Sequence, residues 1–332
     1  MTEARTPVSD TIRLAWLLLA VALATSRLGL IAHELVGHGG TAVAVGGQVT
    51  DVQLFWFAGG WIRYHFAAPP STAALLAISM GGVAIEAISG SLLWALVRRE
   101  ARGPRAGAGP KDRPENDGLG RRLIRGVGAA LVVHATWYFA TGAWHGYGDG
   151  QLLHHLLGSA RYPVAIAAGA ITCGCAFAGA RAIVGPLAGT QTTHRLASLA
   201  IAAALAGGVH AGLAIAEIRV RGDVTYKEIM APERERLVER DLEKWAAYER
   251  AHGGEVSEAK RAQQQQQLEQ VHRDFPFAWL LGVCVVIALI FGARRSVADV
   301  RAFTIDRRLL ARASTCAGIA IAAVIAIDLV TR

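Results

Sequence analysis

The chain has few cysteines, few charged residues and little short-range apolar periodicity. Its four cysteines, Cys173, Cys175, Cys284 and Cys316, all fall in apolar stretches. A single residue separates Cys173 from Cys175, whereas cysteine-based zinc sites place two to four residues between paired thiols. We therefore interpret all four as small buried hydrophobes, which say nothing about the redox compartment. Internal repeats are also absent, which excludes a solenoid or propeller.

What the chain does have is a series of long apolar blocks. Hydrophobic residues make up 53% of the sequence and charged residues 18%. Blocks of about twenty apolar residues predict an all-α polytopic membrane protein with about seven transmembrane helices. We expect these spans near residues 12–38, 72–97, 123–144, 162–186, 195–217, 275–293 and 309–330.

The first block has two features of its own. It continues directly into a histidine cluster with no small-residue cleavage site before it, so we expect no cleavable signal peptide. It also contains Arg27, which we expect to face protein or to reach the interface rather than to face lipid.

The chain has a net charge of +8, and the distribution of its basic residues indicates how the chain is oriented in the membrane. Basic residues are concentrated in two connections, 98–125 and 294–312, whereas 39–70 and 145–161 carry only Arg63 and Arg161. This alternation predicts an inside amino terminus with seven spans. Because the charge lies between spans, the expected partner is the lipid bilayer, and we expect no nucleic acid.

The connections differ in character. Alternating β-branched and aromatic residues between glycine pairs predict a small β-hairpin at 48–66, after the first span. The stretch 99–121, rich in Gly, Pro and Arg, predicts a disordered basic loop. After additional transmembrane helices in 161–218, the polar segment 219–274 predicts an extramembrane helical hairpin with helices at 232–251 and 257–272. C-terminal transmembrane helices follow in 275–332.

The motif that carries chemistry lies at the end of the first span, in His33-Glu34-Leu35-Val36-Gly37-His38. Two imidazoles and a carboxylate are costly in hydrocarbon, so together they indicate a functional site. His33 and His38 are candidate zinc ligands, and Glu34 is a candidate general base.

The spacing of these histidines is unusual. In the metalloprotease motif the histidines are four residues apart, about 40° around an α-helix, whereas five residues give about 140°. A π-bulge at Gly37 would return His33 and His38 to one face. Alternatively, Glu34 and His38, which are four residues apart, form the facing pair.

A third ligand is also expected. The best candidate is Asp149, just beyond the third span, because the glycines on either side let the backbone approach closely. His145, His154 and His155 lie near it in sequence, and Glu86 lies within the second span. We expect these four to hold the ligands in place, to face the substrate, or to serve packing alone.

Three stretches, in this order, resemble the site-2 protease family of intramembrane zinc metalloproteases, especially its small bacterial members. Residues 32–49 are similar to the family's zinc helix, glycine pair and following strand, with one extra residue between the histidines. Residues 79–84 resemble the glycine-bearing start of its second core span. Residues 149–153 are similar to the Asp-Gly motif that donates the third zinc ligand, although the Asn and Pro that usually precede it are missing.

The resemblance implies a zinc-dependent endopeptidase with its membrane core in residues 1–160, in the bacterial inner membrane. Zn²⁺ would be bound by His33, His38 and Asp149, and Glu34 would act as general base and acid. The substrate would be a membrane-spanning or membrane-adjacent helix of another protein, unwound by pairing with the strand at 49–57. In that family the zinc helix runs from outside to inside, which is opposite to the direction that the arginines predict.

Two other functions fit parts of the pattern. A membrane di-iron oxygenase would use the histidines, but it needs many closely spaced ones and no Glu34 or Asp149. A receptor or transport component could retain a degenerate protease core without catalysis. Metal content distinguishes the oxygenase from a protease, because the oxygenase would hold two irons and the protease one zinc. The effect of Glu34→Gln distinguishes the receptor, because only an enzyme would lose activity while still binding zinc.

Overall fold

The protein is a multi-pass helical membrane protein. The computed structural model describes residues 7–100, 116–187, 192–296, 305 and 307–331. Within these residues, seven helical stretches are long and apolar enough to cross a membrane. A two-stranded antiparallel sheet accompanies them, so the predicted fold class is confirmed.

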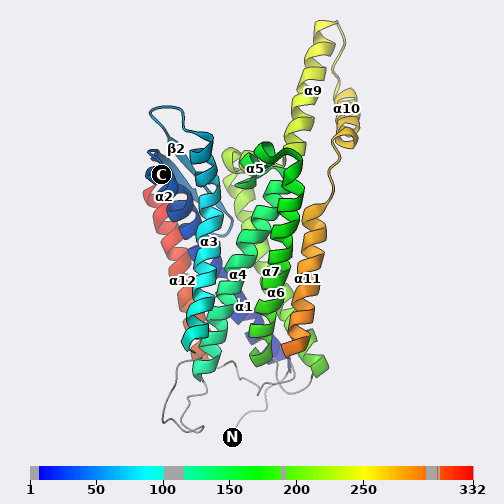
Figure 1. Ribbon diagram of the computed structural model, residues 1–332. Helices are drawn as coiled ribbons and strands as arrows, with labels where there is room; N and C mark the ends of the chain where they lie inside the picture. Colours follow the sequence, from blue (N-terminus) through cyan, green and yellow to red (C-terminus); the bar gives the residue numbers. More distant parts are fainter. Residues whose placement is uncertain (1–6, 101–115, 188–191, 297–304, 306, 332) are drawn as a thin grey trace.

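The long helices of the first half alternate in direction, and the small sheet lies at one end of them (Figure 1). In chain order, the elements of this half are α1 (Pro7–Ile31), the π-helical segment η1 (Ala32–Gly39), α2 (Gly40–Ala44), β1 (Gln48–Leu54), β2 (Gly60–His65), α3 (Thr72–Glu100), α4 (Asn116–His145), α5 (Gly150–Leu157) and the 3₁₀ turn η2 (Gly158–Ala160).

The second half adds four more long helices and an extramembrane arm. Its elements are α6 (Arg161–Leu187), α7 (Thr192–Arg221), α8 (Val224–Met230), α9 (Glu233–Ala251), α10 (Glu258–Val271), α11 (Phe277–Ser296) and α12 (Arg307–Val330). The two helices expected at 232–251 and 257–272 are present as α9 and α10, which project well beyond the other helices (Figure 1).

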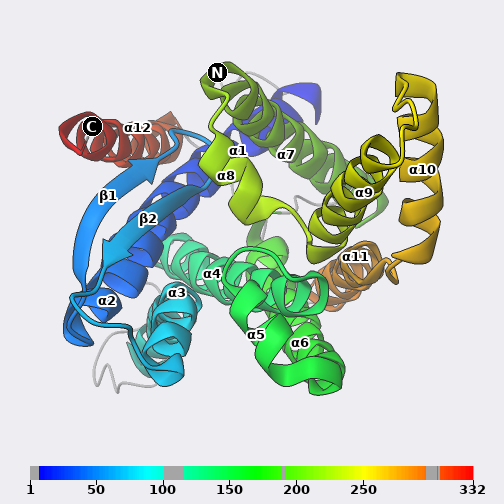
Figure 2. The ribbon, with the colours of Figure 1, turned by 90° about the horizontal axis from the view of Figure 1, so that it is seen from above.

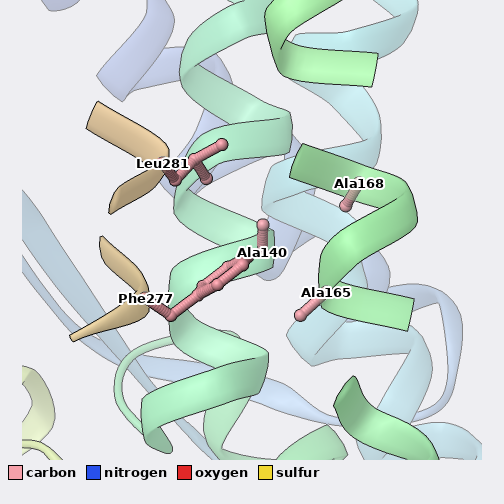
Figure 3. Packing of buried hydrophobic residues seen from close by; sticks show 5 residues of the cluster. All are labelled: Ala140, Ala165, Ala168, Phe277 and Leu281. Carbon is pink, nitrogen blue, oxygen red and sulfur yellow. The ribbon is translucent and has the colours of Figure 1, made fainter. Parts of the chain in front are cut away.

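Two packing groups make up the bundle (Figure 2). In one, α1 packs against α7 and α12; in the other, α4 packs against α3 and α6, and α6 packs against α11. Figure 3 shows the second group, in which Ala140, Ala165 and Ala168 leave room for Phe277 and Leu281. Small residues let helix backbones approach closely in a bilayer, where the hydrophobic effect does not drive helices together.

The sheet is placed so that its two strands have different neighbours. Gln48 pairs with His65 and Leu54 with Gly60, with an irregularity between Val49 and Asp51. β1 lies beside α12, whereas β2 contacts η1 and faces the interior of the bundle (Figure 2). β2 is therefore the strand nearer the histidine motif of the first span, because it lies on the inner side of the ribbon.

Two sequence predictions need correction. The bounds 99–121 expected for a loop are wrong at both ends, because α3 continues to Glu100 and α4 begins at Asn116; residues 101–115 lie outside the described part. α8 was not predicted at all, because its seven residues are too few to show helical periodicity.

Candidate metal centre

The first span changes its helical type at the histidine motif. Residues Ala32–Gly39 form a π-helix, and the backbone N–H of Gly40 donates to the carbonyl of Leu35, five residues earlier. A π-turn contains one residue more than an α-turn, so residues five apart return to the same face. The predicted irregularity at Gly37 is confirmed, and the five-residue spacing is compatible with a shared site.

Glycines at the contact with α3 make this arrangement possible. A Cβ added at Gly37 would lie 2.5 Å from Cα of Gly82, and one added at Gly81 would collide with the carbonyl oxygen of Gly37. Backbone therefore rests on backbone here, and any larger side chain would separate the two helices. Gly82 also leaves room for the imidazole of His33, whose Cε1 would be 2.6 Å from an added Cβ.

A second glycine-dependent contact delivers Asp149. Gly148 has a φ of 51°, which is strained for residues with a side chain, and it turns the chain into α5. Gly150 then lies directly on the backbone of Gly142 in α4, where an added Cβ would collide. Asp149 is therefore held against the end of α4, close to η1.

The three predicted ligands converge on one point. Nε2 of His33 lies 3.1 Å from Nε2 of His38, and the two oxygens of Asp149 lie 3.0 Å and 3.1 Å from these nitrogens. Both imidazoles are buried. The alternative pairing of Glu34 with His38 is wrong, because the π-helix turns His33 toward His38 instead.

The hydrogen bond of His38 shows which of its ring nitrogens is free to bind a metal. Its Nδ1 lies 2.7 Å from the carbonyl oxygen of Ile78 and must donate to it, so Nε2 of a neutral ring carries a lone pair. This lone pair faces a second imidazole and a carboxylate. One oxygen of Asp149 is buried without a well-directed hydrogen bond, although it lies 3.0 Å from His33.

These residues fit a zinc ion. Tetrahedral bonds of about 2.0–2.2 Å place neighbouring ligand atoms about 3.3 Å apart, close to the separations found here. A bound cation would take the place of the imidazole protons that can otherwise bridge these nitrogens and the carboxylate. Three protein ligands also leave one position of a tetrahedron for water or substrate, as in catalytic sites.

Electrostatics keeps Asp149 in its ligand form. Burial raises the pKa of its carboxyl, but His38 and His33, when protonated, lower this pKa by more, so it lies well below its ordinary value before any metal binds. The carboxylate is therefore ionised at neutral pH, as metal binding requires.

Glu34 lies between two cavities. One, of about 420 Å³, is also lined by His38, Asp149 and the β2 residues Gly60–Ile62. The other, of about 600 Å³, is largely apolar and extends along α1 and α4 as far as Leu17 and Leu123. The candidate base thus has access to an opening beside β2 and to an apolar space within the bundle.

The remaining candidate residues divide into two groups. Glu86 is buried, lies 3.8 Å from Nδ1 of His33 and 2.9 Å from Nδ1 of His134, and is suited to orient His33. His155 lines the smaller cavity. His145 and His154 line neither of these two cavities, and their rings contact Asp274 and a backbone carbonyl of α4.

A polar network that the sequence did not reveal anchors the turn between β1 and β2. Glu217 accepts hydrogen bonds from the backbone N–H groups of residues 56, 57 and 58. Arg221 pairs with Glu217 and, through two nitrogens, with the fully buried Asp328. Arg27 donates to the carbonyls of residues 55 and 58, so the prediction that it faces protein is confirmed.

The other unpredicted element, α8, connects this turn to the Asp149 loop. The ring of Tyr226 packs on Phe55, with ring centroids 4.7 Å apart. At the end of α8, the carbonyl of Ile229 accepts from the N–H of Gly148, next to Asp149. Acidic and basic residues near the ends of spans were the only signal for the anchoring network, and α8 had none.

No family model, no curated protein and no solved structure matches this chain.

Proposed function

We propose that this protein is a zinc-dependent intramembrane protease of the bacterial inner membrane, similar to site-2 proteases. The proposal is carried by one observation: His33, His38 and Asp149 converge within metal-ligand distances, beside Glu34 and at the wall of a cavity. A zinc ion bound there would supply a Lewis acid and lower the pKa of water.

The chain's own residues have distinct tasks in this proposal. Glu34 accepts a proton from the attacking water and passes it to the leaving amine, as the C–N bond breaks and the carbonyl carbon gains a hydroxyl. His38 is fixed in orientation by the carbonyl of Ile78, whereas Nδ1 of His33 faces the carboxylate of Glu86 at 3.8 Å, which is too long for a hydrogen bond. Such outer contacts keep metal ligands in place during turnover.

The substrate we propose is a membrane-spanning or membrane-adjacent helix that unwinds at the site. An extended segment can add to a sheet edge, with backbone hydrogen bonds giving affinity. The strand expected for this at 49–57 corresponds to β1, but β2 lines the cavity, and its edge away from β1 has no partner strand among the described residues. We therefore assign the pairing to β2.

The rival functions receive less support from the geometry. The described residues contain one group of convergent ligands, whereas a di-iron site needs two adjacent metal positions. A non-catalytic receptor has no need for a carboxylate poised next to the ligands and open to two cavities.

The decisive experiment compares cleavage and metal content. Purified protein carrying Glu34→Gln should bind zinc at the wild-type ratio of one per chain but lose roughly 10²–10⁴-fold in cleavage of a single-span substrate. His38→Ala should lose both. Glu228→Gln, the same change at an exposed residue of α8, is the matched control and should alter neither.

Contrary results are equally clear. Cleavage that persists in Glu34→Gln would remove the base from the mechanism. Two irons in place of one zinc would favour the oxygenase.

A further inference from the structure

The two ends of the helical bundle differ in what they carry. α1, α4, α7 and α12 run toward the end where the β1–β2 hairpin lies, and α3, α6 and α11 start there (Figure 1). We call this end, which also carries α5 and α8–α10, the site end. His38 is six residues from the last residue of α2, so the metal centre lies within about 9 Å of that end.

Arginines are concentrated at the other end. The final residues of α3, α6 and α11 and the first residues of α4, α7 and α12 lie there. The arginines in these helix ends are Arg98, Arg99, Arg121, Arg122, Arg125, Arg181, Arg195, Arg294, Arg295, Arg307, Arg308 and Arg312.

The short connections at the site end are nearly free of such residues. Residues 45–71 contain only Arg63 and residues 146–161 only Arg161, and the last turn of α7 adds Arg219 and Arg221. The long segment 222–276 has nine basic residues, but twelve acidic residues accompany them, and most of both kinds lie on α9 and α10, which project away from the spans (Figure 1).

Basic residues near span ends are retained on the cytoplasmic side, where anionic lipids attract them. Short connections determine this bias, whereas longer segments are translocated with little regard to charge. The arginine-rich end is therefore the cytoplasmic end.

We propose that the metal centre and the α9–α10 arm face the non-cytoplasmic side of the membrane, which is opposite to the orientation that the resemblance to site-2 proteases implies. A consequence, which rests on the proposed function, is that the protein cuts its substrate in the non-cytoplasmic part of a membrane helix or just outside it. The arm then stands on the same side as the substrate segment that enters the cavity beside β2.

The orientation is tested without reference to activity. In a chain with its four cysteines replaced by alanine, single cysteines are introduced by Gln266→Cys on α10, Ala67→Cys after β2 and Ala108→Cys between α3 and α4. Intact bacterial cells that express the full chain are treated with a membrane-impermeant maleimide.

Residues 266 and 67 should be labelled in intact cells, and residue 108 should be labelled at least about tenfold more after permeabilisation. The use of two probes at the site end guards against one variant that fails to fold. The reverse pattern, with residue 108 accessible and the other two protected, would overturn the proposal.

The consequence for cleavage is tested with a single-span substrate that carries a different tag at each end. Wild-type protein should release the non-cytoplasmic tag, and Glu34→Gln should not. Release of the cytoplasmic tag would overturn the assignment of the cut. Expected labelling with no cleavage of any substrate would support the orientation and count against the proposed function.

Discussion

Gly82 provides the sharpest test of the metal centre, because it lies against a ligand without being one. A Cβ added there would be 2.6 Å from Cε1 and 2.7 Å from Cδ2 of His33. Non-bonded carbon atoms pack at about 3.5–4.0 Å, so Gly82→Ala requires the ring or α3 to move by about 1 Å. α3 has little freedom to withdraw, since Gly81 and Gly82 rest on the backbone of Gly37.

The size of the effect follows from how narrowly metal sites tolerate displacement. Metal–ligand distances hold to within about 0.2 Å, so a shift of about 1 Å removes His33 from the coordination sphere. We expect zinc affinity to fall by at least the roughly 10–100-fold that loss of a residue supporting a ligand causes. Peptide cleavage should fall in parallel.

The assay is a competition titration of purified protein with a chromophoric zinc chelator, together with metal analysis. The matched control is Gly174→Ala in α6, where an added Cβ meets nothing within 4 Å. It should bind zinc normally, and its stability should be unchanged or slightly higher because alanine favours helix. A folded Gly82→Ala protein with wild-type zinc affinity would refute the placement of His33.

Three further predictions concern the surroundings of the site. Glu86→Gln should weaken zinc binding about tenfold, measured by the same titration, because it removes the carboxylate facing His33. Asp328→Asn should lower the free energy of unfolding by about 3 kcal/mol in denaturant titrations, because it leaves the largely covered Arg221 with less countercharge. Burial raises the pKa of the Asp274 carboxyl, but its contact with His145 lowers this pKa by more, so the net value lies below the ordinary one. The ionised Asp274 therefore stabilises the folded protein above about pH 4, and this contribution is lost as the pH falls below that value. Thermal unfolding of Asp274→Asn should lack this loss.

Each of these has a clear contrary result. Unchanged zinc affinity in Glu86→Gln would leave Glu86 with a packing role alone. Wild-type stability in Asp328→Asn would show that the hairpin turn is held by other contacts. A melting profile of Asp274→Asn that still declines below pH 4 as in wild type would assign that decline to other carboxyl groups.

Much of the fold followed from composition alone. Apolar blocks of membrane-spanning length, interrupted by polar or arginine-rich connections, predicted the spans, because a bilayer permits few other structures for such segments. The hairpin and the extramembrane arm had local signals as well: glycine pairs around alternating residues in one case, and a proline start with a glycine stop in the other.

The ligand set was also accessible from sequence, because charged and imidazole side chains are costly in an apolar span and are seldom found there without a function. The five-residue spacing of His33 and His38 even indicated that the helix must be irregular. Sequence could not decide whether His33 or Glu34 faces His38, since that depends on how α3 supports the π-turn through Gly37, Gly81 and Gly82.

What only the tertiary structure decided is the assembly around the metal centre. Glu217, Arg221 and Asp328 lie more than 150 residues from the turn they anchor, and nothing local connects them to it. The short helix α8, which joins that turn to the Asp149 loop, likewise has no periodic signature. Sequence determines which segments enter the membrane because that depends on local hydrophobicity, whereas contacts between distant spans depend on how the whole bundle packs.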